Sequence, residues 1–137
     1  MNVAKSNRTV LLVEDSDDDA FFFERSFANS GIVASLIRVA NGGEAVDYLQ
    51  KASQDSSDLS QTHLVFLDLK LPLLNGFEVL KWIKERGISV EVVVLSGSDI
   101  ESDMKTAALL GAADYLVKPI SVKELQKHLK REAVSDL

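Results

Sequence analysis

Five short runs of β-branched and large apolar residues alternate along the chain with five stretches of helical periodicity, and this alternation most constrains the fold. The runs predict strands at residues 9–13, 33–39, 63–68, 90–95 and 113–117. The intervening stretches predict helices at residues 16–29, 44–52, 77–86, 100–110 and 121–131. Strands and helices in alternation form a parallel sheet with right-handed crossovers and helices on both faces. We therefore expect an α/β fold, with the second strand at an edge because it carries Ser35 and Arg38.

The third run, which begins at His63, is apolar on both faces and ends on a single carboxylate, Asp68. Turn-forming residues follow at Pro72 and at Asn75-Gly76. Such a run is typical of a strand that is buried on both faces. In open α/β sheets the chemistry takes place at the carboxyl ends of the strands. Asp68 is therefore the first candidate for a working residue.

The first predicted helix carries acidic residues in its first turn and a group of aromatic residues further along. Ser16 followed by Asp19 resembles a capping box, and Asp17–Asp19 suit the positive end of the helix dipole, so these acids are predicted to be surface charges. Phe22, Phe23 and Phe27 are predicted to share the buried face, with Phe21 partly exposed.

Polar stretches between the elements predict turns and loops. Residues 41–43 (Asn-Gly-Gly) predict a turn, and residues 53–62 predict a surface loop. His63 and His128 are interpreted as structural or solvated, with no metal or phosphotransfer role.

Composition excludes several classes of protein. The 137 residues suit one domain, expected to span 1–137 with a core of about 8–131, short flexible tails and no output domain. There is no cysteine, so disulfides and thiolate chemistry are excluded. A net charge of −6 without a basic block disfavours nucleic-acid binding. No apolar run or signal peptide indicates a membrane role, and we expect a cytoplasmic protein.

Four of the predicted strands end on polar residues, and parallel strands bring their carboxyl ends to one edge. These residues are Glu14-Asp15, Asp68, Ser96 and Lys118. Three carboxylates in one place repel each other and require a cation, and ligation by oxygen alone favours Mg²⁺. Such a cation neutralises phosphoryl oxygens, and Lys118 and Ser96 would bind those that remain. With Asp68 as the nucleophile, the product is an aspartyl phosphate.

With these motifs in this order, the chain resembles the receiver domains of two-component response regulators from about residue 9 to residue 131. Further matches are Leu71-Pro72 and Asn75-Gly76 after the acceptor and residues 111–115 (Gly-Ala-Ala-Asp-Tyr) before the lysine. The resemblance implies a flavodoxin-like, doubly wound (βα)₅ sandwich of three layers, with a five-stranded parallel sheet in the order 2-1-3-4-5.

The resemblance also implies roles at the acidic site. Asp68 would be the phospho-acceptor, Asp15 a direct metal ligand, Glu14 a ligand through water and the Lys70 main-chain carbonyl a further ligand. Mg²⁺ would be the cofactor, and Mn²⁺ can substitute for it. Glu14 replaces the Asp of many members, which the family tolerates. Lys70 departs from the pattern by placing a cation two residues after the acceptor, and we hypothesise that it hinders the attacking water and lengthens the phosphate lifetime.

The remaining implied roles concern the phosphoryl oxygens and the switch. Lys118 would bind phosphate, and its peptide bond to Pro119 is expected to be cis. Ser96, where Thr is also common, and Tyr115 would form the switch pair: the hydroxyl turns to the phosphoryl group and the ring moves inward. From the residues alone, Tyr115 remains open to interpretation as an ordinary packing aromatic.

Implied partners are a sensor histidine kinase or phosphotransfer protein upstream and a separate protein target downstream, with a homodimer through the last helix or strand as an option. Residues 13–16 (Val-Glu-Asp-Ser), the loop at 53–62 and residues 67–72 are similar to small regulators paired with bacterial phytochrome kinases.

Three alternative functions differ from this one in the residues that they need. A Mg²⁺-dependent phosphohydrolase of the haloacid dehalogenase type needs an acid two residues after the nucleophile for acid–base catalysis. Lys70 occupies that position, which argues against this function. A nucleotide-binding protein of this fold class needs a glycine-rich loop after the first strand. The segment after the first strand here is Glu-Asp-Ser, which argues against this function. A phosphate-independent interaction module on the same fold stays open. In the leading interpretation the chain is a signalling switch and not a turnover enzyme.

Overall fold

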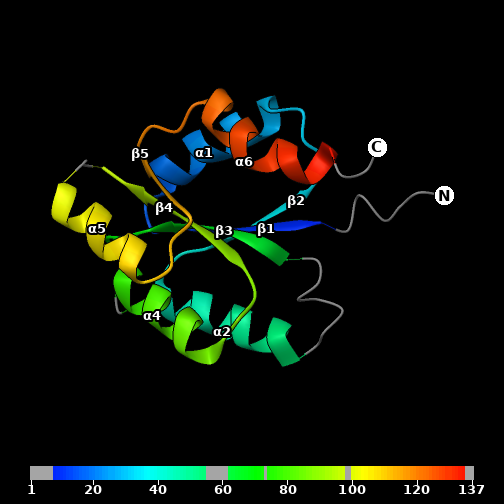
Figure 1. Cartoon of the computed structure of the whole chain (residues 1–137). Coiled ribbons are helices and arrows are strands. Elements are labelled where there is room, and N and C mark those ends of the chain that lie inside the picture. The colour runs from blue at the N-terminus through cyan, green and yellow to red at the C-terminus, as the bar shows by residue number, and fades with distance from the viewer. Residues whose placement is uncertain (1–7, 55–61, 73, 98–99, 135–137) are drawn as a thin grey trace.

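The computed structural model describes residues 8–54, 62–72, 74–97 and 100–134. The strands are β1 (Thr9–Val13), β2 (Ser35–Val39), β3 (Thr62–Asp68), β4 (Glu91–Ser96) and β5 (Asp114–Val117). The helices are α1 (Asp17–Asn29), α2 (Gly42–Gln54), α4 (Gly76–Arg86), α5 (Glu101–Leu109) and α6 (Val122–Val134). All the strand pairs are parallel, in the order β2-β1-β3-β4-β5, as the resemblance implied (Figure 1).

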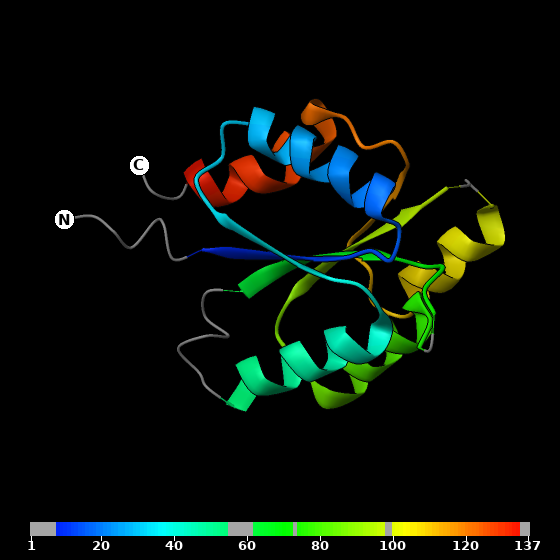
Figure 2. The same ribbon diagram turned by 180° about the vertical axis from the view of Figure 1, so that it is seen from behind.

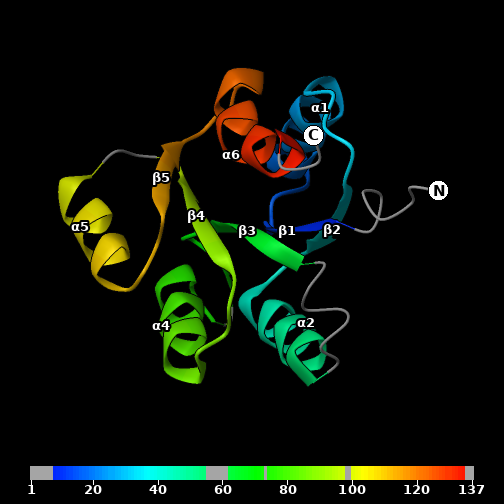
Figure 3. The ribbon, with the colours of Figure 1, turned by 45° about the vertical axis from the view of Figure 1, so that its right-hand side comes forward.

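Helices cover both faces of the sheet. α1 and α6 lie together on one face, and α2 and α4 lie on the other, both in the front view and from behind (Figure 2). Figure 3 shows α5 beside β5, where it extends the layer of α2 and α4. The predicted three-layer sandwich is therefore confirmed. None of the described helices is long and apolar enough to cross a membrane.

The alternation of side chains along each central strand builds the two halves of the core. In β1, Leu12 faces the α1–α6 layer and Leu11 faces the α2–α4 layer, and both are fully buried. In β3, Phe66 likewise faces the α1–α6 layer and Val65 faces the α2–α4 layer. Because successive side chains of a strand point to opposite faces, only a strand covered on both sides reads as one continuous apolar run.

The aromatic face of α1 differs from the prediction. Phe23 and Phe27 are buried against the core, but Phe22 is 55% exposed, as is Phe21. An α-helix advances by about 100° per residue, so the positions i and i+4 share a face and Phe22 turns away from it. The two exposed rings pack edge-to-face with their centroids 5.8 Å apart.

The start of α2 lies where a turn was predicted. The Glu44 backbone N–H donates to Asn41 Oδ1 (2.8 Å), and Glu44 Oε1 accepts from the Ala40 N–H (2.7 Å), so these groups satisfy the helix start and Gly42 is already helical. A Cβ on Gly42 would overlap the main-chain oxygen of Leu74, which explains why this position is a glycine.

Other boundaries moved by a few residues. β2 begins at Ser35 and not at residue 33, and it is an edge strand as expected. Of the predicted loop at 53–62, residues 53 and 54 belong to α2 and residue 62 to β3, while residues 55–61 lie outside the described residues. α6 continues to Val134, past the expected end. Gly87 ends α4 in the left-handed conformation (φ 64°), which a glycine adopts without strain.

His128 is buried within the α6 side of the fold. Its Nε2 lies 2.9 Å from Asp114 Oδ2, and its Nδ1 lies 3.8 Å from Glu91 Oε2. The side chain is 5% exposed and therefore structural, but it has acidic partners that its isolated position in the sequence did not suggest.

Candidate functional site

The polar residues at the carboxyl ends of β1, β3, β4 and β5 meet at one edge of the sheet, as the sequence predicts. In the parallel register Val13 pairs with Leu67, Asp68 with Leu95, and Ser96 with Val117, so the strand ends lie side by side. Glu14, Asp15, Asp68 and Lys118 line a cavity of about 550 Å³, and its wall includes Phe22, Pro119 and Ile120. The cavity therefore combines an acidic floor with an apolar wall.

Three carboxylates form the acidic floor. Glu14, Asp15 and Asp68 each place a carboxylate oxygen within 4.8 Å of the others. Glu14 is 1% exposed and Asp68 is 4% exposed, whereas Asp15 faces solvent. Buried like charges at this spacing are costly unless a cation lies among them, and carboxylate oxygens are the ligands that Mg²⁺ prefers. The donor set therefore fits a hard divalent cation.

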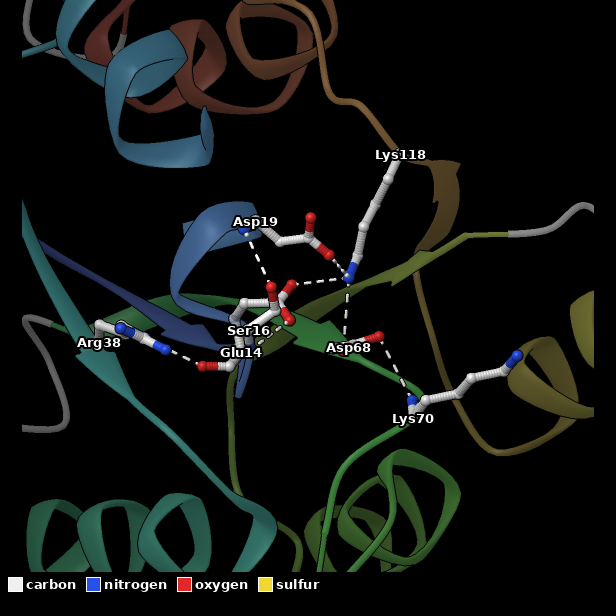
Figure 4. Close-up of polar contacts among 7 residues, drawn as sticks. All are labelled: Glu14, Ser16, Asp19, Arg38, Asp68, Lys70 and Lys118. Carbon is white, nitrogen blue, oxygen red and sulfur yellow. Dashed lines mark hydrogen bonds and ion pairs between the residues drawn. The ribbon is translucent and has the colours of Figure 1, made fainter. Parts of the chain in front are cut away.

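Lys118 provides a positive charge at the same place. Its Nζ lies 2.7 Å from Glu14 Oε1, 2.9 Å from Asp19 Oδ2 and 3.4 Å from Asp68 Oδ2 (Figure 4). The Lys118–Pro119 peptide bond is cis, as expected, and the Lys118 backbone N–H donates to the Ser96 carbonyl (2.7 Å). The loop after β5 thus holds the lysine over the acidic floor.

Burial and the lysine act in opposite directions on Glu14. Burial raises the pKa of Glu14 to about 7, although the hydrogen bond from Lys118 opposes the shift, and the nearby Asp68 charge adds to it. For Lys118, burial lowers the pKa, but its bonds to Glu14 and Asp19 outweigh burial and raise the pKa above its ordinary value. The lysine therefore stays charged while Glu14 titrates near neutral pH.

Asp68 sits at the end of β3 between Lys118 and the following loop. Its Oδ1 accepts from the Lys70 backbone N–H (3.3 Å), and its Oδ2 is the oxygen nearest Lys118. The Lys70 side chain is exposed and points away from the Asp68 carboxylate (Figure 4). Gly76, at the start of α4, lies against this segment so closely that a Cβ would come 2.6 Å from the Asp68 carbonyl oxygen.

The two residues of the expected switch pair lie in neighbouring strands. Ser96 ends β4 and is 2% exposed. Tyr115, in β5, is half-buried and packs against the core of the α2–α4 layer, and its backbone N–H donates to Asp114 Oδ1 (2.8 Å). Their role in switching stays a prediction.

Two residues at the site were missed by the sequence interpretation. Asp19 was predicted to be a surface charge, but it binds Lys118. Arg38, in β2, donates through Nε to the Glu14 carbonyl (3.0 Å) and through Nη1 to Asp17 Oδ1 (3.0 Å). The position of Asp19 in the first turn of α1, which directly follows the end of β1, was a usable signal, whereas no local pattern pointed to Arg38.

The comparisons with known proteins agree with this geometry. The profile of the response regulator receiver domain family matches residues 10–130. The probable methanogenesis regulatory protein FilR2 of Methanothrix harundinacea is 35% identical over 120 residues, which cover 86% of this chain and 76% of that protein. The chain spans about half the length of several other curated relatives that it matches.

Two solved structures are similar over nearly the whole chain. The Mn²⁺-bound form of the response regulator Rcp1 is 32% identical with a TM-score of 0.71, and the match covers 90% of each chain. The bacteriophytochrome response regulator RtBRR is 32% identical with a TM-score of 0.74, and the match covers 95% of this chain and 77% of the other.

Proposed function

The chain belongs to the response regulator receiver domain family, whose members act in two-component signalling, and from this premise we propose that it is a switch phosphorylated on Asp68 with the help of Mg²⁺. The observation that supports the proposal most strongly is the convergence on Asp68 of two further carboxylates and the Lys118 ammonium. A nucleophile, a site for a cation and a fixed positive charge are what phosphoryl transfer to a carboxylate needs.

In the proposed reaction Asp68 is the nucleophile. A bond forms between an Asp68 carboxylate oxygen and phosphorus, while the bond from phosphorus to the imidazole nitrogen of the donor breaks and its electron pair leaves with that nitrogen. Lys118 and the Ser96 hydroxyl bind oxygens of the transferred group. The Lys118 Nζ lies 3.4 Å from Asp68 Oδ2, so a small movement of its flexible side chain is enough to bring it to an oxygen of the phosphoryl group on Asp68.

The proposed metal ligands are the Asp15 carboxylate directly, Glu14 through water, Asp68 and the Lys70 main-chain carbonyl. When it is bound, Mg²⁺ supplies the positive charge that neutralises both the carboxylates and the phosphoryl oxygens. Support comes from the three clustered carboxylates and from the Mn²⁺-bound structure of Rcp1, which shares this fold.

The proposed output is a change of packing at β5. With a phosphoryl group on Asp68, the Ser96 hydroxyl turns toward it and the Tyr115 ring moves inward, which remodels the surface formed by α5, β5 and α6. This is a shift between two packings that the phosphoryl group biases. A separate protein target binds this surface, and a homodimer through α6 or β5 is the alternative output.

We propose a sensor histidine kinase or phosphotransfer protein as the phosphodonor, and the cytoplasm as the compartment where they meet. RtBRR and the cyanobacterial phytochrome response regulator RcpA, 31% identical with a TM-score of 0.71, point to a phytochrome kinase as the first donor to try. A phosphate-independent interaction module does not require the cluster of Asp15, Asp68 and Lys118, and Lys70 stands where a phosphohydrolase needs an acid.

The test is incubation of the full chain with acetyl phosphate and Mg²⁺, followed by intact mass measurement. We expect a gain of one phosphoryl group in the parent and in Asp18→Asn, an exposed change outside the acceptor, and no gain in Asp68→Asn or without Mg²⁺. Catalytic release of phosphate without an adduct would support a hydrolase. An unchanged mass with no release would support the interaction module.

A further inference from the structure

The Lys118 ammonium is shared among three carboxylates, and one of them belongs neither to the acceptor nor to the acidic floor. Glu14 Oε1 lies 2.7 Å from Nζ and Asp68 Oδ2 lies 3.4 Å from it, and both residues belong to the cluster that fits a cation. The third partner is Asp19 Oδ2 at 2.9 Å, contributed by α1 (Figure 4), and Asp19 also lines the cavity.

The start of α1 leaves the Asp19 side chain available for this contact. The Asp19 backbone N–H donates to Ser16 Oγ (3.2 Å), which is the first half of a capping box. In the second half, the acidic side chain at the third helical position would accept from the N–H of the capping residue. Here Glu14 Oε2 accepts from the Ser16 N–H instead (3.2 Å).

Helix α4 shows the alternative arrangement. Its cap, Asn75, accepts from the Glu78 N–H (3.0 Å), and Glu78 Oε1 accepts from the Asn75 N–H (2.9 Å), so the box closes in both directions. In α1 the same helical position is occupied by an acid that points to a lysine on a different element. The Asp19 carboxylate therefore serves the site and not the helix cap.

Lys118 and a divalent cation compete for the same oxygens. A cation among Glu14, Asp15 and Asp68 would neutralise the carboxylate charge that attracts the ammonium. The cation would also repel the ammonium directly, because both are positive. The Asp19 side chain is 43% exposed and lies outside that cluster, so it offers the ammonium a carboxylate that the cation does not need.

We propose that Asp19 is a positioning residue that holds the Lys118 ammonium aside when Mg²⁺ binds and from which the ammonium moves to the phosphoryl group. The inference rests on the proposed function, because it needs Mg²⁺ at the acidic floor. It assigns a role to an acid that would otherwise count as a surface charge.

The first experiment is a calorimetric titration of Mg²⁺ into the metal-free full chain. In Asp19→Asn the ammonium has only Glu14 and Asp68 to bind, so it competes fully with the cation. Because the lost ion pair is partly exposed, we expect Mg²⁺ binding to weaken by roughly three- to five-fold. Asp18→Asn removes the same charge from an exposed position of the same helical turn and is expected to leave the affinity nearly unchanged.

A double-mutant cycle shows whether Asp19 acts through the lysine. In the Lys118→Met background no ammonium needs to be held, so Asp19→Asn should change the Mg²⁺ affinity no more than Asp18→Asn does. Equal weakening by Asp19→Asn in both backgrounds would mean that Asp19 attracts the ion by charge alone and would overturn the proposal. Equal affinities of Asp19→Asn and Asp18→Asn in the parent background would also overturn it.

A conservative variant separates positioning from folding. Asp19→Glu keeps a carboxylate on a longer side chain and should restore much of the Mg²⁺ affinity lost in Asp19→Asn, while the far-ultraviolet spectrum checks that all variants are folded. This titration involves no phosphoryl transfer. A chain that shows the Lys118-dependent effect but gains no phosphoryl group would refute the proposed function and keep only the role of Asp19 in holding the ammonium aside when Mg²⁺ binds. A phosphorylated chain without the effect would refute the inference and keep the proposed function.

Discussion

The buried carboxylate of Glu14 makes the stability of the metal-free protein depend on pH. Burial raises its pKa from 4.5 to about 7, so the folded state favours the neutral acid more than the unfolded chain does. The contribution of Glu14 to stability is therefore fully present below about pH 4.5 and is lost as the pH rises through about 7. Lys118 stays charged over this range, because its pKa is raised.

The size of the effect follows from the two pKa values. Between pH 5 and pH 8, linkage with pKa values of 4.5 and about 7 gives a loss of about 2.5 kcal/mol in the free energy of unfolding. Gln at position 14 has the shape of the neutral acid and does not titrate. Compared with Glu14→Gln, the parent should therefore lose about 2.5 kcal/mol more stability over that range.

The assay is urea unfolding of the metal-free parent and of Glu14→Gln at both pH values, followed by the far-ultraviolet signal. Comparing the two proteins cancels the contributions of the other carboxylates. Saturating Mg²⁺ should shrink the difference, since the cation favours the ionised acid. Parallel pH profiles of the two metal-free proteins would refute the reasoning, because they would mean that burial does not disfavour the charge.

Three further predictions concern the metal ligands, a close backbone contact and the phosphate lifetime. Asp15→Asn should weaken Mg²⁺ binding at least about tenfold with little effect on unfolding, because the side chain is exposed; an unchanged calorimetric affinity would exclude it as a direct ligand. Gly42→Ala should destabilise the fold by about 2 kcal/mol, because its Cβ would overlap the Leu74 carbonyl. Gly43→Ala, where the added Cβ meets only a side-chain oxygen at 3.3 Å, should be neutral or stabilising by about 0.5 kcal/mol in urea unfolding; equal losses would contradict the steric argument. Lys70→Asn should lose its phosphoryl group faster than the parent when decay is followed by intact mass, and slower loss would rule out a protective lysine.

The fold was predictable because the buried parallel strands carry an unambiguous pattern. β1 and β3 are covered on both faces, so they appear in the sequence as unbroken apolar runs. Parallel pairing brings their ends to one edge, which is why Asp15, Asp68 and Lys118 could be grouped although they are far apart in the sequence.

The details that the sequence missed depend on tertiary contacts. Phe22 is exposed because the helix turns it away from the face that Phe23 occupies, and a cluster of three consecutive aromatic residues obscured that difference. Asp19 was assigned to the surface because its partner, Lys118, lies 99 residues further along the chain. Arg38 meets Glu14 only because β2 pairs with β1. No local pattern encodes such pairings.

The central claim is that Asp68 carries the phosphoryl group, and chemical mapping tests it most directly. After reaction with acetyl phosphate and Mg²⁺, borohydride reduces an aspartyl phosphate to homoserine, and tandem mass spectrometry of the peptides then locates the altered residue. We predict homoserine at position 68, and none there when Mg²⁺ is withheld. Homoserine at Asp15 or Asp19, with Asp68 unmodified, would contradict the account.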